Sequence, residues 1–288
     1  MSRRHPSSLP EELRKLDRPL VIGVLNVTPD SFSDGGKHYE PTSAVAHGID
    51  LCREGADIID VGGESTRPGA TPVSAQVELS RVLPVVSALV AAGVHVSIDT
   101  MKAEVARESV AAGACVVNDV SGGLFDAAMY STVASLNVPY VLMHWRGEAS
   151  VMDQHAVYDD VAGDVVRELS DRLQAAIAGG VDPDSIVVDP GLGFAKEVDQ
   201  NWQVLHHLDE FVRLGYPVLI GASRKRFLGA LLADSEGRPR EFAERDAATD
   251  AVSALAAAAG VWGVRVHNVK AAVDSVLVGR AWARGRQQ

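Results

Sequence analysis

The sequence has only two cysteines and no excess of positive charge. Cys52 falls in a predicted helix and Cys115 at the start of a predicted strand, so they form neither a CxxC pair nor a disulfide framework, and we expect both to be small buried residues. Lys and Arg number 27 against 38 Asp and Glu, which gives a formal net charge of −11. Because binding to a phosphate backbone requires a basic surface, this balance argues against nucleic acid as the main partner.

Long apolar segments are also missing. No run approaches the roughly 20 residues of a transmembrane helix, and the N-terminus lacks the apolar core of a signal peptide. We therefore expect no membrane partner and a cytoplasmic location. The chain of 288 residues is nevertheless 47% hydrophobic, which is enough for the core of one barrel-sized domain or of two small domains.

Several catalytic motifs are absent as well. Gly191 and Gly193 are not followed by the third glycine of a dinucleotide fingerprint, because residue 196 is Lys. The patterns GxxxxGK[ST], HExxH and GxSxG do not occur, and no His-x-His follows the first predicted strand. A serine triad and a tightly held zinc are therefore disfavoured. The remaining candidates for a site are carboxylates, amides and cations.

A regular alternation of short apolar runs and helical patterns fills most of the chain. The patterns predict strands at 21–25, 57–61, 94–98, 114–118, 140–143, 185–188, 217–220 and 261–266. They predict helices at 42–55, 74–92, 103–112, 126–136, 159–178, 201–214, 225–259 with a polar break at 234–240, and 269–283. About eight β/α units without a linker predict one α/β domain over residues 19–288, a (β/α)₈ TIM barrel, although a doubly wound sheet shares the same local pattern. The polar leader at 1–18 either holds a short helix at 11–16 or stays disordered.

Polar side chains end many of the predicted strands. TIM-barrel enzymes place their sites at the carboxyl ends of the strands, so these side chains are candidates for a site. The alternation of a strand places His95, Ser97 and Asp99 on one face, and it likewise places Arg265 and His267 together. Any one of these residues fits an ordinary helix cap or turn, but several at the same level of successive strands favour a site. The strand-end candidates are Asn26, Asp60, Asp99, Asn118, His144 and Asp189.

Seven short segments carry a family resemblance. They are NVTPDSFSDGG (26–36), DVGGESTRPG (60–69), SIDT (97–100), ND (118–119), DPGLGF (189–194), SRK (223–225) and RVH (265–267). Together, and in this order, they resemble the dihydropteroate synthases, the folate-pathway enzymes that sulfonamides inhibit. The resemblance spans about residues 21–267. It implies a homodimeric barrel that condenses 6-hydroxymethyl-7,8-dihydropterin pyrophosphate with p-aminobenzoate and releases pyrophosphate with the aid of Mg²⁺.

The resemblance also implies a role for each matching residue. The pterin subsite is Asp99, Asn118, Met143, Asp189 and Lys225, and the pyrophosphate subsite is Asn26, Arg265 and His267, with Asn26 as the Mg²⁺ ligand. The p-aminobenzoate subsite is Phe32, Thr66, Arg67, Pro68, Phe194, Ser223 and Lys225. The residues expected to serve catalysis are Asn26, Asp34, Lys225, Arg265 and His267, with Asp34 carried by a mobile loop at 28–36 and a second mobile loop at 63–69.

The implied chemistry suits these residue types. A reduced pterin presents N–H donors beside a carbonyl, so carboxylates and an amide can bind it by complementary hydrogen bonds. Pyrophosphate is a strong anion, and arginine keeps its charge at every relevant pH. Once that anion is neutralised, it is a good leaving group, and positioning with electrostatics suffices for a dissociative displacement.

One departure and two alternatives accompany this interpretation. Residue 226 is Arg, where many family members have a small hydroxyl residue near the p-aminobenzoate carboxylate. A barrel that passes a methyl group from methyltetrahydrofolate to a corrinoid would share the pterin carboxylates but would need neither Arg265 nor His267. A non-catalytic pterin binder is expected to have lost Asn26, Lys225 or Arg265, and all three are present.

Overall fold

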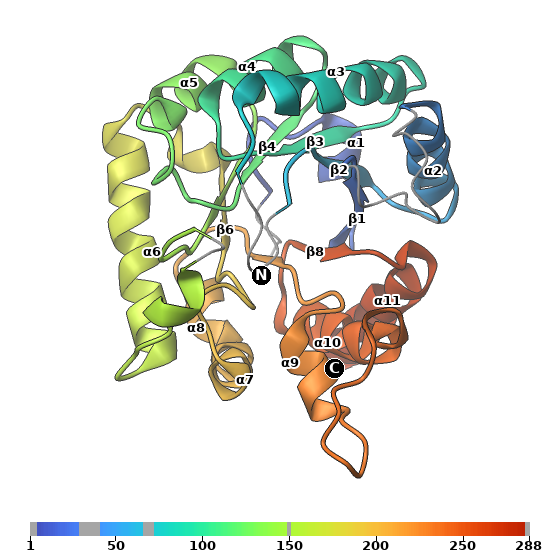
Figure 1. Ribbon diagram of the computed structural model, residues 1–288, viewed down its shortest axis with the longest axis vertical. Coiled ribbons are helices and arrows are strands. Elements are labelled where there is room, and N and C mark those ends of the chain that lie inside the picture. The colour runs from blue at the N-terminus through green and yellow to red at the C-terminus, as the bar shows by residue number, and fades with distance from the viewer. Residues whose placement is uncertain (1–4, 29–40, 66–71, 149–150, 286–288) are drawn as a thin grey trace.

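Eight parallel strands form the wall of the molecule (Figure 1). The computed structural model describes residues 5–28, 41–65, 72–148 and 151–285. The strands are β1 (Leu20–Asn26), β2 (Ile58–Gly62), β3 (Val96–Asp99), β4 (Val116–Asp119), β5 (Tyr140–Met143), β6 (Ile186–Asp189), β7 (Leu219–Ile220) and β8 (Gly263–Val266). Their order is β6-β5-β4-β3-β2-β1-β8-β7, and a parallel bridge from Val188 to Val218 joins the two ends. The predicted TIM barrel is confirmed, and the doubly wound alternative is wrong because the order runs once around a nearly closed ring.

Helices surround this barrel (Figure 1). They are α1 (Glu11–Arg14), α2 (Pro41–Arg53), α3 (Ala75–Ala91), α4 (Ala103–Ala111), α5 (Met129–Leu136), α6 (Val161–Ala178), α7 (Val198–His206), α8 (Leu208–Arg213), α9 (Arg226–Leu231), α10 (Asp246–Ala259) and α11 (Val269–Gly285). Short 3₁₀ turns lie at Met152–His155 (η2), Pro183–Ser185 (η3) and Phe242–Glu244 (η4). Within the described ranges, no helix has both the length and the apolar composition that crossing a membrane requires.

The structure corrects three local predictions. The helix predicted at 201–214 is two helices, because His207 leaves helical geometry at φ −98° and ψ 27° and its ring Nδ1 bonds the carbonyl of Gln203. The interruption in the predicted helix at 225–259 is wider than 234–240, since α9 ends at Leu231 and α10 begins at Asp246. Cys52 and Cys115 are half-buried rather than fully buried, although both pack against the core.

The core has an outer and an inner layer. Outward-facing strand residues such as Val21, Ile59 and Ile98 pack against the helices. Inward-facing residues at the amino ends of the strands form a separate apolar cluster that also contains Leu9 and Leu13 from the N-terminal segment. The other members of this cluster are Leu20, Ile22, Ile58, Val116, Val141, Val187, Leu219 and Trp262. Apolar side chains therefore fill the barrel at the amino ends of the strands, and the polar inward-facing residues lie at the carboxyl ends.

Candidate active site

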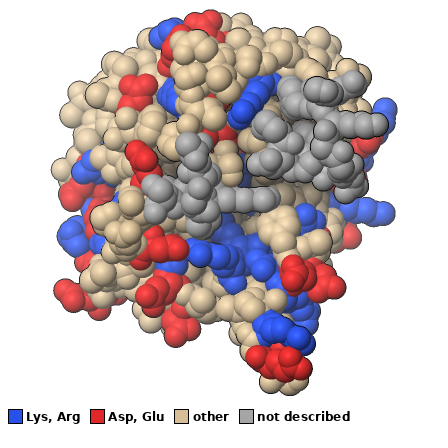
Figure 2. All heavy atoms as spheres, in the orientation of Figure 1, with Lys and Arg blue, Asp and Glu red and all other residues tan. Residues whose placement is uncertain are grey.

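A cavity of about 1120 Å³ lies at the carboxyl ends of the strands. Its walls include nine of the predicted site residues: Asn26, Asn118, Met143, Asp189, Phe194, Ser223, Lys225, Arg265 and His267. Figure 2 shows blue Lys and Arg side chains gathered in the middle of this face, although the chain as a whole is acidic. The predicted residues Phe32, Asp34, Thr66, Arg67 and Pro68 lie outside the described residues. The local concentration of cations suits an anionic ligand.

Arg265 joins three strand ends into one cluster. Its Nε donates to Asp60 Oδ2 at 2.6 Å, and its Nη2 donates to Asp99 Oδ2 at 2.7 Å. Asn118 Nδ2 donates to the same Asp60 oxygen at 2.9 Å. Burial raises the pKa of Asp99 to about 7, against the lowering effect of Arg265. Asp99 lines a smaller neighbouring cavity, whereas its partner Arg265 lines the main cavity.

Lys225 is held over the loop that follows β6. Its ammonium donates to the carbonyl of Leu192 and lies 4.8 Å from the centre of the Phe194 ring. Gly193 has a φ of 75°, and a Cβ there would lie 2.9 Å from the Lys225 side chain, so glycine is needed both for conformation and for space. Burial lowers the pKa of Lys225 to about 8, while the nearby Asp189 opposes this shift. Burial also raises the pKa of Asp189, whose Oδ1 accepts from the Gly191 N–H at 2.7 Å.

His267 is oriented by Ser223. The backbone N–H of His267 donates to Ser223 Oγ at 3.1 Å, and this hydroxyl lies 2.9 Å from His267 Nδ1. When the hydroxyl donates to Nδ1, the neutral ring carries its hydrogen on Nε2. The Phe242 ring packs edge-on against the imidazole with 5.6 Å between centroids. The position and ring plane of His267 are therefore set by neighbours on two sides.

Not every strand-end candidate reaches the cavity. His144 is buried behind the wall between Lys196 and Glu168. Asp60 accepts hydrogen bonds from Arg265 and Asn118, which both line the cavity. Asp119, the second residue of the ND segment, accepts from Ser121 and from the Tyr140 hydroxyl, and thus fixes the loop after β4.

Several residues of the cavity wall had no role assigned from the sequence, and Lys196 and Arg226 are two of them. Lys196 borders the cavity but follows no strand-end or helical pattern that would mark it. Arg226 is paired with Asp153 of η2 at 2.9 Å, and both residues border the cavity. The nearest signal in the sequence was the departure at residue 226, which could not name the partner because Asp153 is 73 residues away.

Comparison with known proteins identifies the family. The model of pterin binding enzymes matches residues 22–267. The dihydropteroate synthase of Mycobacterium leprae (strain TN) is 53% identical over 269 residues, which cover 93% of this chain and 95% of the relative. The chain belongs to the dihydropteroate synthase family. It is therefore a transferase of folate biosynthesis rather than a corrinoid methyltransferase.

Other dihydropteroate synthases agree in sequence and in fold. The enzyme of Bacillus subtilis (strain 168) is 45% identical, with 91% of this chain and 87% of the relative covered. The Yersinia pestis enzyme, solved with a sulfonamide drug complex, has a TM-score of 0.85 and 39% identity, with 94% of this chain and 96% of that chain covered. The Xanthomonas albilineans enzyme in complex with 7,8-dihydropteroate has a TM-score of 0.81 and 44% identity, with 92% and 94% covered.

Proposed function

We propose that this cavity condenses 6-hydroxymethyl-7,8-dihydropterin pyrophosphate with p-aminobenzoate to give 7,8-dihydropteroate and pyrophosphate. The supporting observation is the meeting of two kinds of group in one cavity. Acceptors from Asn118 and Asp189 lie deep in the barrel, and the cations of Lys225 and Arg265 lie beside them. The first set suits the N–H edge of a pterin, and the second suits a pyrophosphate.

The pterin subsite is proposed to be Asp99, Asn118, Met143, Asp189 and Lys225. The Asn118 amide nitrogen is already engaged with Asp60, so its carbonyl oxygen is the end left to accept from a pterin N–H. Lys225 supplies a donor for the pterin carbonyl, and Met143 supplies an apolar surface. Asp60 is a positioning residue in this arrangement, because it orients both Asn118 and Arg265.

The pyrophosphate subsite is proposed to be Arg265 and His267 with Asn26. Mg²⁺ keeps several waters and phosphate oxygens as ligands, and one amide oxygen at the end of β1 fits this habit. Among the described residues, no group of three or more His, Cys, Asp or Glu forms a protein-only metal site. When bound, Mg²⁺ would neutralise the leaving group. Arg265 would share that charge, since its carboxylate partners keep its pKa above the usual value despite burial.

The p-aminobenzoate subsite is proposed to include Phe194, Ser223 and Lys225 from the described cavity wall. Phe32, Thr66, Arg67 and Pro68 remain proposed members, and Asp34 a proposed catalytic residue, from the ranges outside the described residues. In this scheme, departure of pyrophosphate leaves a cation at the pterin methylene, and the amine then attacks it. The protein contributes orientation and electrostatic stabilisation rather than a covalent intermediate.

The decisive experiment follows pyrophosphate release from the two substrates with Mg²⁺. We expect pyrophosphate release when both substrates are present, and the reaction product should comigrate with 7,8-dihydropteroate. Adding a chelator should stop turnover while the circular dichroism spectrum stays unchanged, because the metal serves the leaving group and not the fold. A folded wild-type protein that releases no pyrophosphate would refute the proposal, and turnover that survives chelation would refute the role of Mg²⁺.

The assembly is proposed to be a homodimer in the cytoplasm. Several exposed apolar side chains lie on the two final helices: Leu255 on α10, and Leu277, Val278 and Trp282 on α11. Such a surface is costly to leave in water, and a second copy would cover it. Trp282→Asp should shift the protein to monomer in analytical ultracentrifugation, whereas Leu231→Asp, an exposed apolar residue on α9, should not.

The proposed cytoplasmic location is supported by the cysteines. Cys52 and Cys115 are both free, and a reducing compartment such as the cytoplasm keeps thiols unpaired.

A further inference from the structure

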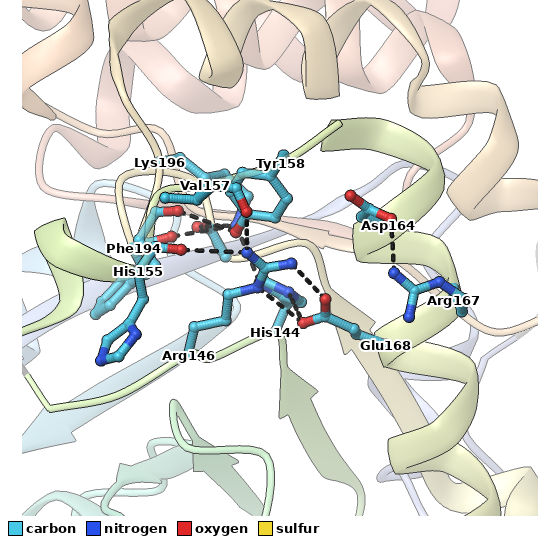
Figure 3. A network of polar contacts seen from close by, with 12 residues as sticks. His144, Arg146, His155, Val157, Tyr158, Asp164, Arg167, Glu168, Phe194 and Lys196 are labelled. Carbon is cyan, nitrogen blue, oxygen red and sulfur yellow. Dashed lines mark hydrogen bonds and ion pairs between the residues drawn. The ribbon is translucent and has the colours of Figure 1, made fainter. Parts of the chain in front are cut away.

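A buried lysine of the cavity wall, Lys196, takes part in a network of polar contacts (Figure 3). Lys196 belongs to the loop between β6 and α7 and is only 5% exposed. Its ammonium donates to His144 Nδ1 at 3.1 Å, to the carbonyl of Gly191 at 3.1 Å and to the carbonyl of Phe194 at 3.2 Å. In its ammonium form, Lys196 therefore has an acceptor for each of its three N–H groups within the described part of the chain, and burial lowers its pKa to about 7. Lys196 borders the cavity, but its donors are directed into the protein and not toward a ligand.

The contacts of Lys196 continue through His144 to helix α6. His144 Nε2 lies 3.0 Å from Glu168 Oε2, and Arg146 Nε donates to the same oxygen at 3.0 Å. Burial lowers the pKa of His144 to about 4, so the ring is neutral near pH 7. A neutral ring that donates from Nε2 to Glu168 must accept at Nδ1, which is where Lys196 binds. The tautomer of His144 thus fixes the direction of the whole chain of hydrogen bonds.

Tyr158, whose ring packs against Arg146, contacts the same loop, between β6 and α7, through a second set of interactions. Arg146 donates to the carbonyl of Val157 at 2.6 Å and lies 3.7 Å from the centre of the Tyr158 ring. The Tyr158 hydroxyl donates to the carbonyl of Ala195 at 2.9 Å. Ala195 has a φ of 46°, a left-handed conformation that an L-residue with a side chain rarely adopts. The loop between β6 and α7 therefore does not hold its shape by local preference, and the contacts of Lys196 and Tyr158 hold it on either side of Ala195.

These contacts of Lys196 and Tyr158 fix the position of Phe194. Its carbonyl accepts from Lys196, the next residue is clamped by Tyr158, and its ring lies against the Lys225 ammonium. We propose that Lys196, with His144, Glu168 and Tyr158, is a positioning system that sets the Phe194 ring for p-aminobenzoate. Lys196 itself contacts no substrate. This inference rests on the proposed assignment of Phe194 to the p-aminobenzoate subsite.

The test is a double-mutant cycle read as the KM for p-aminobenzoate. We expect Lys196→Met to raise this KM about 10-fold and Tyr158→Phe to raise it about 2- to 5-fold, the range for losing buried hydrogen bonds, with the KM for the pterin pyrophosphate changed much less. If Lys196 acts through Phe194, the double variant Lys196→Met/Phe194→Ala should be no worse than Phe194→Ala alone. Arg167→Met is the matched control, since its partner Asp164 lies on the same helix as Glu168 but forms an exposed pair outside the network (Figure 3).

A purely structural role predicts a different result. Additive effects in the double variant, or equal rises in both KM values, would overturn the proposal. If Lys196→Met does not fold, the cycle between Tyr158→Phe and Phe194→Ala decides in the same way, because it removes a single hydroxyl. Wild-type turnover separates the two proposals: an inactive wild type removes the proposed function, whereas an active wild type with unshifted variants removes only the positioning role.

Discussion

Burial acts on the charged residues of the cavity in opposite directions according to their sign. It raises the pKa of Asp99 to about 7 and that of Asp189 above its usual value, and it lowers the pKa of Lys225 to about 8. Each of these shifts is opposed by a neighbour of opposite charge. Removing one member of a pair therefore changes the charge state of the other, and single substitutions here have effects on two groups.

Asp189→Ala should weaken binding of the pterin pyrophosphate. The loss of a charged hydrogen bond is worth roughly 1.5–3 kcal/mol, or about 10- to 150-fold in affinity. The pKa of Lys225 should also fall further, since Asp189 is the strongest influence that raises it. Isothermal titration calorimetry measures the affinity, and Asp171→Ala, an exposed carboxylate on α6, should bind as the wild type does. Equal affinity for Asp189→Ala and the wild type would remove Asp189 from the pterin subsite.

Asp246→Asn should destabilise the fold in a pH-dependent way. Arg224 donates to Asp246 at 2.6 and 2.8 Å, and these bonds hold the pKa of Asp246 below its usual 3.8. A carboxyl whose pKa is lowered on folding stabilises the protein above pH 3.8, and this contribution is lost as the pH falls through the folded pKa. We expect urea denaturation to show a loss of roughly 1 kcal/mol at neutral pH that shrinks below pH 3.8. A loss that stays constant into acid would contradict the ion pair as its cause.

At the level of secondary structure, the predictions succeeded where the signal was local. Strand β5 was predicted at 140–143 and has these bounds, because its short apolar run follows Pro139 and ends at the polar His144. The polar residues at strand ends were found because alternation along a strand fixes which side chains share a face. Two contacts of the site could not be predicted, because no local pattern encodes contacts between residues far apart in the sequence. Arg265 bonds Asp60 across 205 residues, and Lys196 bonds His144 across 52.

The N-terminal segment shows the same limit. Its polar composition led us to expect either a short helix or disorder, and α1 forms at Glu11–Arg14. The sequence did not reveal that Leu9 and Leu13 would pack inside the barrel, because the helical spacing of Leu9, Leu13 and Leu16 indicates an apolar face but not the surface that covers it. Leu9 and Leu13 are buried because they pack against the inward-facing apolar residues of the strands at the amino end of the barrel.

The close approach of α10 and α11 predicts a sharp difference between two glycines of α11. A Cβ at Gly279 would lie 2.1 Å from the carbonyl oxygen of Ala254 on α10, so the two backbones would have to separate. Gly279→Ala should therefore cost roughly 1–3 kcal/mol by overpacking, measured as a fall in the free energy of unfolding. Gly285→Ala, with nothing within 4 Å, should be neutral or slightly stabilising. Similar values for both variants would show that α10 and α11 do not cross this closely.

The whole molecule is a barrel with two unlike ends. The amino ends of the strands are closed by an apolar cluster that includes Leu9, Leu13 and Trp262. The carboxyl ends open into the cavity, where the cations gather despite a net charge of −11. This division separates stability from chemistry, because substitutions in the apolar end can weaken the fold without touching the site.

Leu13→Ala tests this separation directly. Leu13 is 4% exposed and lies in the apolar cluster at the closed end, so truncating it removes buried methyl groups and leaves a cavity among the inward-facing residues. Substitutions of this kind cost roughly 2–5 kcal/mol, and urea denaturation should report a loss in this range. The KM values for both substrates should stay at their wild-type levels, because the carboxyl ends of the strands keep their own contacts. Leu231→Ala, whose side chain is 61% exposed on α9, provides the control and should change stability by less than about 0.5 kcal/mol. A Leu13→Ala variant that keeps its stability but binds substrate poorly would show that the N-terminal segment acts on the site and does not simply close the barrel.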